Sequence, residues 1–200
     1  MKIACVNGWS LSASETRIAF QDWYADAEIE VVAPAPGWEE VLEAFGSIDW
    51  LFGYSLGAFL LLSSGDRFAS LARRISLLAP FEDFKREACL GGRTRKAQLS
   101  YLLKWLDREP RAAVADFRER AGLSEAGVAL ERSTEDLKWG IRTLRNTACE
   151  SGMLSRFEGY IGECDPLLDA QRISELYSNV VVVANAGHDL KSLLRGVEGK

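Results

Sequence analysis

Residues 50–62 read WLFGYSLGAFLLL, and this stretch decides the fold. The apolar run Trp50–Phe52 is typical of a buried strand, and the run Ala58–Leu62 is typical of a buried helix. Between them lies a G-x-S-x-G sequence, Gly53–Gly57, which in this setting predicts a tight, strained turn that leaves the Ser55 oxygen at the C-terminal edge of a sheet. The glycines are expected there because neighbouring backbone crowds the turn. A glycine-lined turn with a capping serine is the alternative interpretation.

Short apolar runs alternate with helical patterns on both sides of this stretch. Helical patterns cover Glu39–Phe45, Leu56–Ser64 and Asp169–Tyr177. Strands that are apolar throughout and alternate with helices indicate a parallel sheet covered on both faces, hence an α/β fold. We predict six strands, at Ile3–Val6, Glu28–Ala33, Asp49–Gly53, Arg74–Ala79, Arg156–Ile161 and Asn179–Ala184.

The stretch from 81 to 155 has helical patterns only. Leucines recur at helical spacing from Leu99 to Leu106, and Pro110 suits the first turn of the next helix. Ser133 begins an S-x-x-[DE] sequence, which is a helix start signal. We therefore predict a core of residues 1–80 and 156–200, interrupted by a helical lid of residues 81–155.

The composition is that of an ordinary globular domain. The 200 residues are 48% hydrophobic and 26% charged, which excludes a disordered or fibrous chain. The net charge of −5 argues against a general nucleic-acid binder. The longest uncharged run, 50–65, is too short to span a bilayer, and Met1–Asn7 does not resemble a signal peptide. We expect a cytoplasmic protein that does not bind membranes.

The cysteines and the single histidine bear on cofactors. Cys5, Cys89, Cys149 and Cys164 form no C-x-x-C pair and match neither a zinc site nor a disulfide framework. A reducing compartment fits this pattern. With one histidine and scattered cysteines no ligand cluster is visible, so we predict no metal and no organic cofactor.

A serine nucleophile needs a base, and His188 is the only histidine in the chain. It follows the last predicted strand, so it should lie at the same sheet edge as Ser55. The base needs an acid to hold its tautomer, and Asp165 follows the fifth predicted strand. The chain order is then Ser, Asp, His. Glu163, Asp169 and Asp189 are alternative acids, and we favour Asp165.

Two backbone N–H groups must stabilise the oxyanion of a tetrahedral intermediate. The amide of Leu56, directly after the nucleophile, is one candidate. The loop after the first strand should supply the other, because Gly8 lets the backbone come close and the amide of Trp9 would then face the site. Trp9 could equally be a core aromatic residue that packs on the turn, and the two roles are compatible.

These motifs resemble the α/β-hydrolase superfamily over nearly the whole chain. The Gly-Trp pair after the first strand, the Gly-Tyr-Ser-Leu-Gly turn and the Gly-x-x-Asp and Gly-His-Asp loops resemble most the pimeloyl-ACP methyl ester esterases of biotin biosynthesis and their carboxylesterase relatives. The resemblance implies hydrolysis of an acyl ester by Ser55, His188 and Asp165, with the Trp9 and Leu56 amides as oxyanion hole. It further implies a mainly parallel six-stranded sheet in the order 2-1-3-4-5-6.

The sequence departs from the family pattern in two places. Asn7 precedes Gly8 where the family usually has histidine, which puts the support of the oxyanion loop in question. The family core also has two further N-terminal strands that this sequence does not show. Those strands lie at the far edge of the sheet, so we expect catalysis to be unaffected.

The predicted lid is where substrate recognition is expected. Residues 85–104 contain six basic residues and one acidic residue, in a protein that is acidic overall. Arg93, Arg95 and Lys96 could dock an acidic acyl carrier protein, although a solvated helix face explains them as well. The leading hypothesis is a serine carboxylesterase acting on pimeloyl-[acyl-carrier protein] methyl ester. A thioesterase or another small-ester hydrolase, and an inactive hydrolase-fold binding protein, are the alternatives.

Overall fold

Six strands form one sheet in the computed structural model, which describes residues 1–123 and 132–198. The strands are β1 (Lys2–Val6), β2 (Glu28–Val32), β3 (Ile48–Tyr54), β4 (Ala72–Leu78), β5 (Glu158–Gly162) and β6 (Val180–Val183). All neighbours pair in parallel, in the order β2-β1-β3-β4-β5-β6. The predicted fold class and strand order are therefore confirmed.

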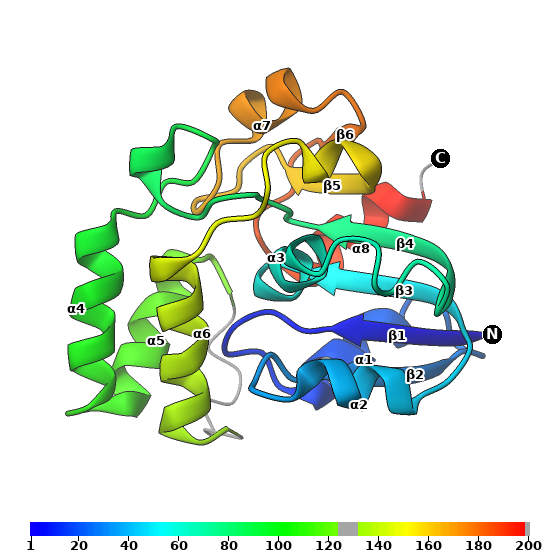
Figure 1. Ribbon diagram of the computed structural model, residues 1–200, viewed down its shortest axis with the longest axis horizontal. Helices are drawn as coiled ribbons and strands as arrows, with labels where there is room; N and C mark the ends of the chain where they lie inside the picture. The colour runs from blue at the N-terminus through cyan, green and yellow to red at the C-terminus, as the bar shows by residue number, and fades with distance from the viewer. Residues whose placement is uncertain (124–131, 199–200) are drawn as a thin grey trace.

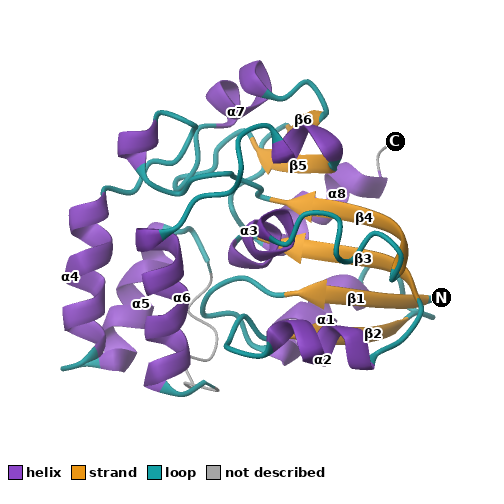
Figure 2. Ribbon diagram, in the orientation of Figure 1, coloured by secondary structure: helices purple, strands orange, loops and turns teal. Residues whose placement is uncertain are grey.

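Helices cover both faces of the sheet (Figures 1 and 2). The helices between strands are α1 (Ala13–Gln21), α2 (Trp38–Ala44), α3 (Leu56–Ser63) and α7 (Ala170–Leu176), and α8 (Leu190–Glu198) follows the last strand. Helices α1 and α8 pack against each other on one face, whereas α2 and α3 lie on the other. Strands β1, β3 and β5 are buried almost throughout, which explains their mainly apolar sequences, whereas the edge strand β2 and the first half of β4 carry partly exposed charged residues.

Three further helices stand beside the carboxyl edge of the sheet (Figure 1). They are α4 (Lys96–Leu106), α5 (Pro110–Arg120) and α6 (Thr134–Asn146), with the short 3-10 helices η1 (Arg86–Ala88) and η2 (Met153–Arg156) before and after them. Pro110 occupies the first turn of α5, and Ser133 caps α6 by accepting a hydrogen bond from the Asp136 amide. These helices come from the predicted lid, 81–155, of which residues 124–131 lie outside the described part.

Buried Glu82 anchors the chain where it leaves and re-enters the sheet. Its carboxylate accepts hydrogen bonds from the amides of Gly152 and Leu154, at 3.1 and 2.7 Å, and from the hydroxyl of Tyr177 at 2.7 Å. The Glu82 side chain therefore joins the start of η2 to the end of α7. Among the described residues, no helix is long and apolar enough to cross a bilayer.

Candidate active site

Ser55 lies in a turn that only glycine-flanked sequence can form. Its φ and ψ are 53° and −112°, a left-handed conformation that is strained for a side-chain-bearing residue. A Cβ on Gly57 would come within 1.9 Å of the Val6 carbonyl oxygen, and one on Gly53 within 2.7 Å of Ala58 Cα. The turn therefore fixes Ser55 between β3 and α3, at the end of the sheet toward which the strands point.

The structure brings Ser55, His188 and Asp165 together from three separate loops. Ser55 Oγ lies 2.9 Å from His188 Nε2, and His188 Nδ1 lies 2.7 Å from Asp165 Oδ2. His188 and Asp165 are 3% and 1% exposed, so water does not compete for these contacts. Asp165 Oδ1 accepts hydrogen bonds from the amides of Leu167 and Leu168, which leaves the other oxygen directed at the imidazole.

The alternative acids are all engaged elsewhere. Glu163 accepts a hydrogen bond from the Asn185 amide at 2.9 Å. Asp169 caps α7 through the Arg172 amide, and Asp189 accepts from the amide and hydroxyl of Ser192 at the start of α8. Of these four carboxylates, Asp165 is the one in contact with the imidazole of His188.

Tyr54, directly before the nucleophile, is a site residue that the sequence analysis missed. Its hydroxyl donates to the backbone carbonyl of His188 at 2.9 Å. Burial raises the pKa of Tyr54 well above its usual value, and the nearby charges of Asp165 and Asp189 add to this effect. The phenol therefore stays protonated and holds the His188 backbone in place. Its position next to Ser55 was the available signal.

The loop after β1 lies against the turn that carries Ser55. A Cβ on Gly8 would approach the Tyr54 ring to 2.7 Å and Ser55 Cβ to 3.5 Å, so the backbone here passes close to the nucleophile. Among the described residues, no acceptor is found for the Trp9 amide. The Leu56 amide opens α3, where no intrahelical acceptor exists. In the described part of the chain, neither of the two predicted oxyanion donors is therefore engaged by a backbone acceptor.

Asn7 supports this loop from the inside. Its side chain is fully buried and uses both ends of the amide. Nδ2 donates to the carbonyls of Leu11 and Ser12, at 3.1 and 3.2 Å, while Oδ1 accepts from the Gly8 amide and the Thr16 hydroxyl. The asparagine that departs from the family pattern therefore ties the two ends of the loop together.

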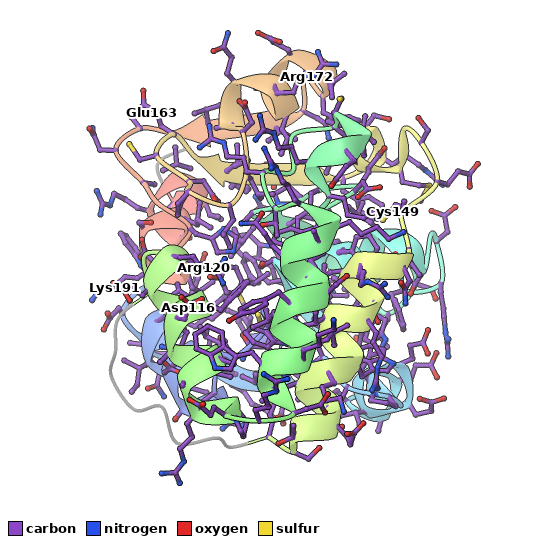
Figure 3. All side chains as sticks on the ribbon, turned by 90° about the vertical axis from the view of Figure 1, so that its left-hand side faces the viewer. Asp116, Arg120, Cys149, Glu163, Arg172 and Lys191 are labelled. Carbon is purple, nitrogen blue, oxygen red and sulfur yellow. The ribbon has the colours of Figure 1, made fainter. Side chains whose placement is uncertain are left out.

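Helices α5 and α6 hold the same loop from the outside. The indole Nε1 of Trp9 donates to the Leu137 carbonyl of α6 at 2.8 Å. From α5, Arg118 donates through Nη1 to the carbonyl of Ser10 at 3.0 Å and forms an ion pair with Glu15 at 2.5 Å. Ser10 has a φ of 66°, so Arg118 binds the most strained residue of the loop. Helices α4, α5 and α6 face the viewer in Figure 3.

The three basic residues predicted to dock a carrier protein differ in their contacts. Arg93 turns toward the catalytic loop, where its Nη1 donates to the backbone carbonyl of Asp165 at 2.9 Å. Arg95 and Lys96, at the start of α4, are exposed to solvent. Arg93 is therefore part of the support of Asp165, which its position in the sequence did not indicate.

Cysteine, histidine and acidic side chains are the usual ligands of protein-bound metal ions. All four cysteines are free thiols. Over residues 1–123 and 132–198, no group of three or more His, Cys, Asp or Glu side chains is arranged to hold a metal ion.

Solved structures with this fold are numerous, although no family model and no curated protein matches the sequence. The whole chain superposes on 90% of an esterase from Exiguobacterium antarcticum, with a TM-score of 0.72 and 12% identity. A thermophilic esterase from Thermogutta terrifontis gives a TM-score of 0.70 at 14% identity, covering 99% of this chain and 86% of that one.

A third similar structure is an α/β hydrolase enzyme from a Medee basin deep-sea metagenome library. The superposition covers 100% of this chain and 89% of that enzyme, with a TM-score of 0.63 and 14% identity. This chain has the α/β-hydrolase fold. The fold therefore supports the superfamily that the motifs predicted. The sequence identity to each of these three proteins is very low.

Proposed function

We propose that this α/β-hydrolase-fold protein is a serine hydrolase that cleaves a carboxylic ester. The observation that carries the proposal is the unbroken run of hydrogen bonds from Ser55 Oγ through the imidazole of His188 to Asp165. A serine hydroxyl becomes nucleophilic beside a base, and the carboxylate holds that base in the tautomer that accepts the proton. The esterases and hydrolases of the same fold support this assignment.

In the first half-reaction, Ser55 Oγ attacks the ester carbonyl while His188 Nε2 takes the hydroxyl proton. The carbonyl oxygen becomes an oxyanion that accepts hydrogen bonds from the amides of Trp9 and Leu56. When the intermediate collapses, the alcohol leaves with the proton from His188, and the acyl group remains on Ser55. Loss of one oxyanion donor typically lowers the rate by ~10²–10³-fold.

In the second half-reaction, a water molecule gives its proton to His188 and attacks the acyl-enzyme. The same two amides stabilise the second oxyanion, and His188 returns the proton to Ser55 Oγ as the acid leaves. Asp165 stays ionised throughout and stabilises the imidazolium that forms twice in each turnover. The buried position of the His188–Asp165 pair makes that stabilisation stronger than it would be in water.

Hydrolysis of p-nitrophenyl acetate tests the proposal. We expect turnover by the wild type with a burst of p-nitrophenol that reports the acyl-enzyme, and a loss of about 10⁴-fold or more in kcat for Ser55→Ala and His188→Ala. Ser64→Ala, at the other end of α3, is the matched control and should keep full activity. Equal activity in Ser55→Ala and wild type contradicts the proposal, and a folded but inert wild type favours a binding protein.

For the natural substrate we propose the methyl ester of a pimeloyl group on acyl carrier protein, which places the protein in biotin biosynthesis in the cytoplasm. The resemblance of the four motifs supports this choice. The exposed, positively charged side chains of Arg95 and Lys96, in a chain that is acidic overall, support it as well. Rescue of a biotin auxotroph that lacks its own esterase is the test, with Ser55→Ala as negative control. No rescue despite good expression favours a thioesterase or another small-ester hydrolase.

Carrier docking is tested by charge reversal away from the catalytic loop. The double variant Arg95→Glu/Lys96→Glu should slow hydrolysis of the carrier-bound ester and leave p-nitrophenyl acetate unaffected, because only the carrier contacts these side chains. Arg111→Glu/Arg195→Glu makes the same change of charge at other exposed positions. Arg93 is left out of the test because it also supports Asp165. Equal slowing by both double variants refutes docking at this place.

A further inference from the structure

A groove beside the loop of Asp165 is built from basic side chains that the hydrolytic mechanism does not use. It has a volume of about 530 Å³ and lies between η1 and the start of α7. Figure 1 shows α7 at the top of the molecule, above β5 and β6, and Figure 3 shows Arg172 at the top of the face on which α4, α5 and α6 lie. Its walls are Arg86, Cys89, Gly91, Gly92, Arg93, Asp169 and Arg172.

The groove carries an excess of positive charge. Three guanidinium groups line it against one carboxylate, that of Asp169. Asp169 lies 3.9 Å from Arg93 Nη2 and uses its other oxygen to cap α7, so it neutralises at most part of this charge. Within the part of the chain that the structure describes, the Arg86 guanidinium contacts no acceptor and no carboxylate. Donors are therefore left over for a ligand.

The backbone keeps the groove in one shape. Cys89 and Gly91 both have left-handed conformations, with φ of 58° and 100°. A Cβ on Gly91 would meet Ile173 at 2.4 Å, and one on Gly92 would meet the Phe84 carbonyl oxygen at 2.3 Å. The Gly91 carbonyl also accepts a hydrogen bond from the Asp169 amide. The floor is thus fixed against α7 before any ligand binds, which lowers the entropic cost of binding.

We propose that this groove binds a phosphate ester group through Arg86 and Arg172. Guanidinium groups match the oxygens of phosphate in pairs of parallel hydrogen bonds, and several of them around one site favour a group with more oxygens and more charge than a carboxylate. Arg172 donates through Nε to the Cys89 carbonyl at 3.2 Å, and its Nη1 forms a long, exposed ion pair with Glu175 at 3.9 Å. Within the described part of the chain no acceptor contacts its Nη2, which is left for a ligand. This binding does not depend on the chemistry at Ser55.

Cys89 provides a direct readout, because its exposed thiol lies in the wall of the groove. Cys164 is also exposed but lies outside it and serves as internal control. We expect phenyl phosphate, at constant ionic strength, to slow alkylation of Cys89 by iodoacetamide about tenfold at ten times its Kd, and to leave Cys164 unchanged. Benzoate, with a carboxylate on the same ring, should protect less at every concentration.

Variants identify the side chains that bind. Arg86→Gln/Arg172→Gln should raise the phenyl phosphate concentration for half-protection at least about tenfold. Arg111→Gln/Arg195→Gln removes the same charge from exposed positions elsewhere and should leave it unchanged. Arg86 and Arg172 are both exposed, so the protein should stay folded when they are replaced. The proposal is overturned if Cys89 is not protected, if Cys164 is protected equally, if benzoate protects as well, or if both double variants behave alike.

The phosphate could belong to a distant part of the substrate or to a separate ligand. Competitive inhibition of p-nitrophenyl acetate hydrolysis by phenyl phosphate indicates the first source, and protection of Cys89 without inhibition indicates the second. This comparison alone rests on the proposed hydrolytic function. Protection of Cys89 is measured equally well in Ser55→Ala, so failure of one proposal is distinguishable from failure of the other.

Discussion

At Asp165 the two carboxylate oxygens have separate tasks. One accepts two backbone amides and the other faces the imidazole of His188, so the side chain has a single orientation. The sequence was sufficient to predict that Ser55, His188 and Asp165 meet, because each follows a recognisable strand of a parallel sheet. It could not predict the Tyr54 hydrogen bond to His188, since an apolar strand residue gives no sign of its partner.

Replacing Asp165 by asparagine separates these two tasks. The amide oxygen of Asp165→Asn can still accept from Leu167 and Leu168, but its NH₂ would face Nδ1 and force the wrong tautomer on His188. We expect kcat to fall by ~10³–10⁴-fold with KM little changed. Glu163→Gln is the matched control on the same loop and should keep its activity. Steady-state kinetics on both variants decide the matter, and a fully active Asp165→Asn would exclude Asp165 as the partner of the base.

The loop between β1 and α1 shows how whole elements position a site. Asn7 holds it from inside, while Arg118 of α5 and the Leu137 carbonyl of α6 hold it from outside. The contacts of Arg118 and of the Leu137 carbonyl do not follow from the local sequence, because tertiary packing brings their partners together, whereas the contacts of Asn7 stay within residues 7–16. The sequence analysis also missed α1 and α8, although signals existed: the Ser12–Glu15 capping box and the apolar spacing from Leu190 to Val197.

Arg118 is accordingly a positioning residue for the predicted oxyanion donor Trp9. We expect Arg118→Met to lower kcat for p-nitrophenyl acetate by up to about 10²-fold with a smaller change in KM, because a displaced loop weakens transition-state binding. Arg118→Lys retains the charge and should recover part of the rate. A lower melting temperature with unchanged kcat in Arg118→Met would mean that the residue only stabilises the fold.

The same contact makes stability depend on pH through Glu15. Burial alone would raise the pKa of Glu15, but hydrogen bonds from Arg118 and Ser12 outweigh it and leave the pKa lowered. A carboxyl whose folded pKa is lowered stabilises the protein above its unfolded pKa and loses that contribution as pH falls through the folded value. Urea unfolding from about pH 6 to about pH 3 should therefore show the deficit of Glu15→Gln shrinking toward zero. A constant deficit contradicts the linkage.

Over the whole molecule, the sequence predicted the sheet and its order because apolar runs and crossover rules act locally and generally. It did not predict how α4, α5 and α6 contact the core, or that the half-exposed Arg93 would donate a hydrogen bond to the Asp165 carbonyl. Such contacts depend on distances between parts that are remote in sequence. The reactivity of the four cysteines tests this packing over the whole molecule.

Two of the four cysteines should react in the native protein. Cys89 and Cys164 are exposed, whereas Cys5 is buried in β1 and Cys149 is half-buried. Burial raises the pKa of Cys149 to about 12 and that of Cys5 further, so neither forms a thiolate near neutral pH. A thiol-titrating disulfide reagent should count two groups before unfolding and four in urea. Rapid reaction of all four in the native state would contradict this packing.

The most direct test of the central claim is covalent labelling with a fluorophosphonate, followed by peptide mass mapping. The wild type should take up one phosphonyl group, on the peptide that contains Ser55, and His188→Ala should label far more slowly because the base is missing. An adduct on any other residue, or equal labelling of Ser55→Ala and wild type, would contradict the assignment of Ser55 as the nucleophile.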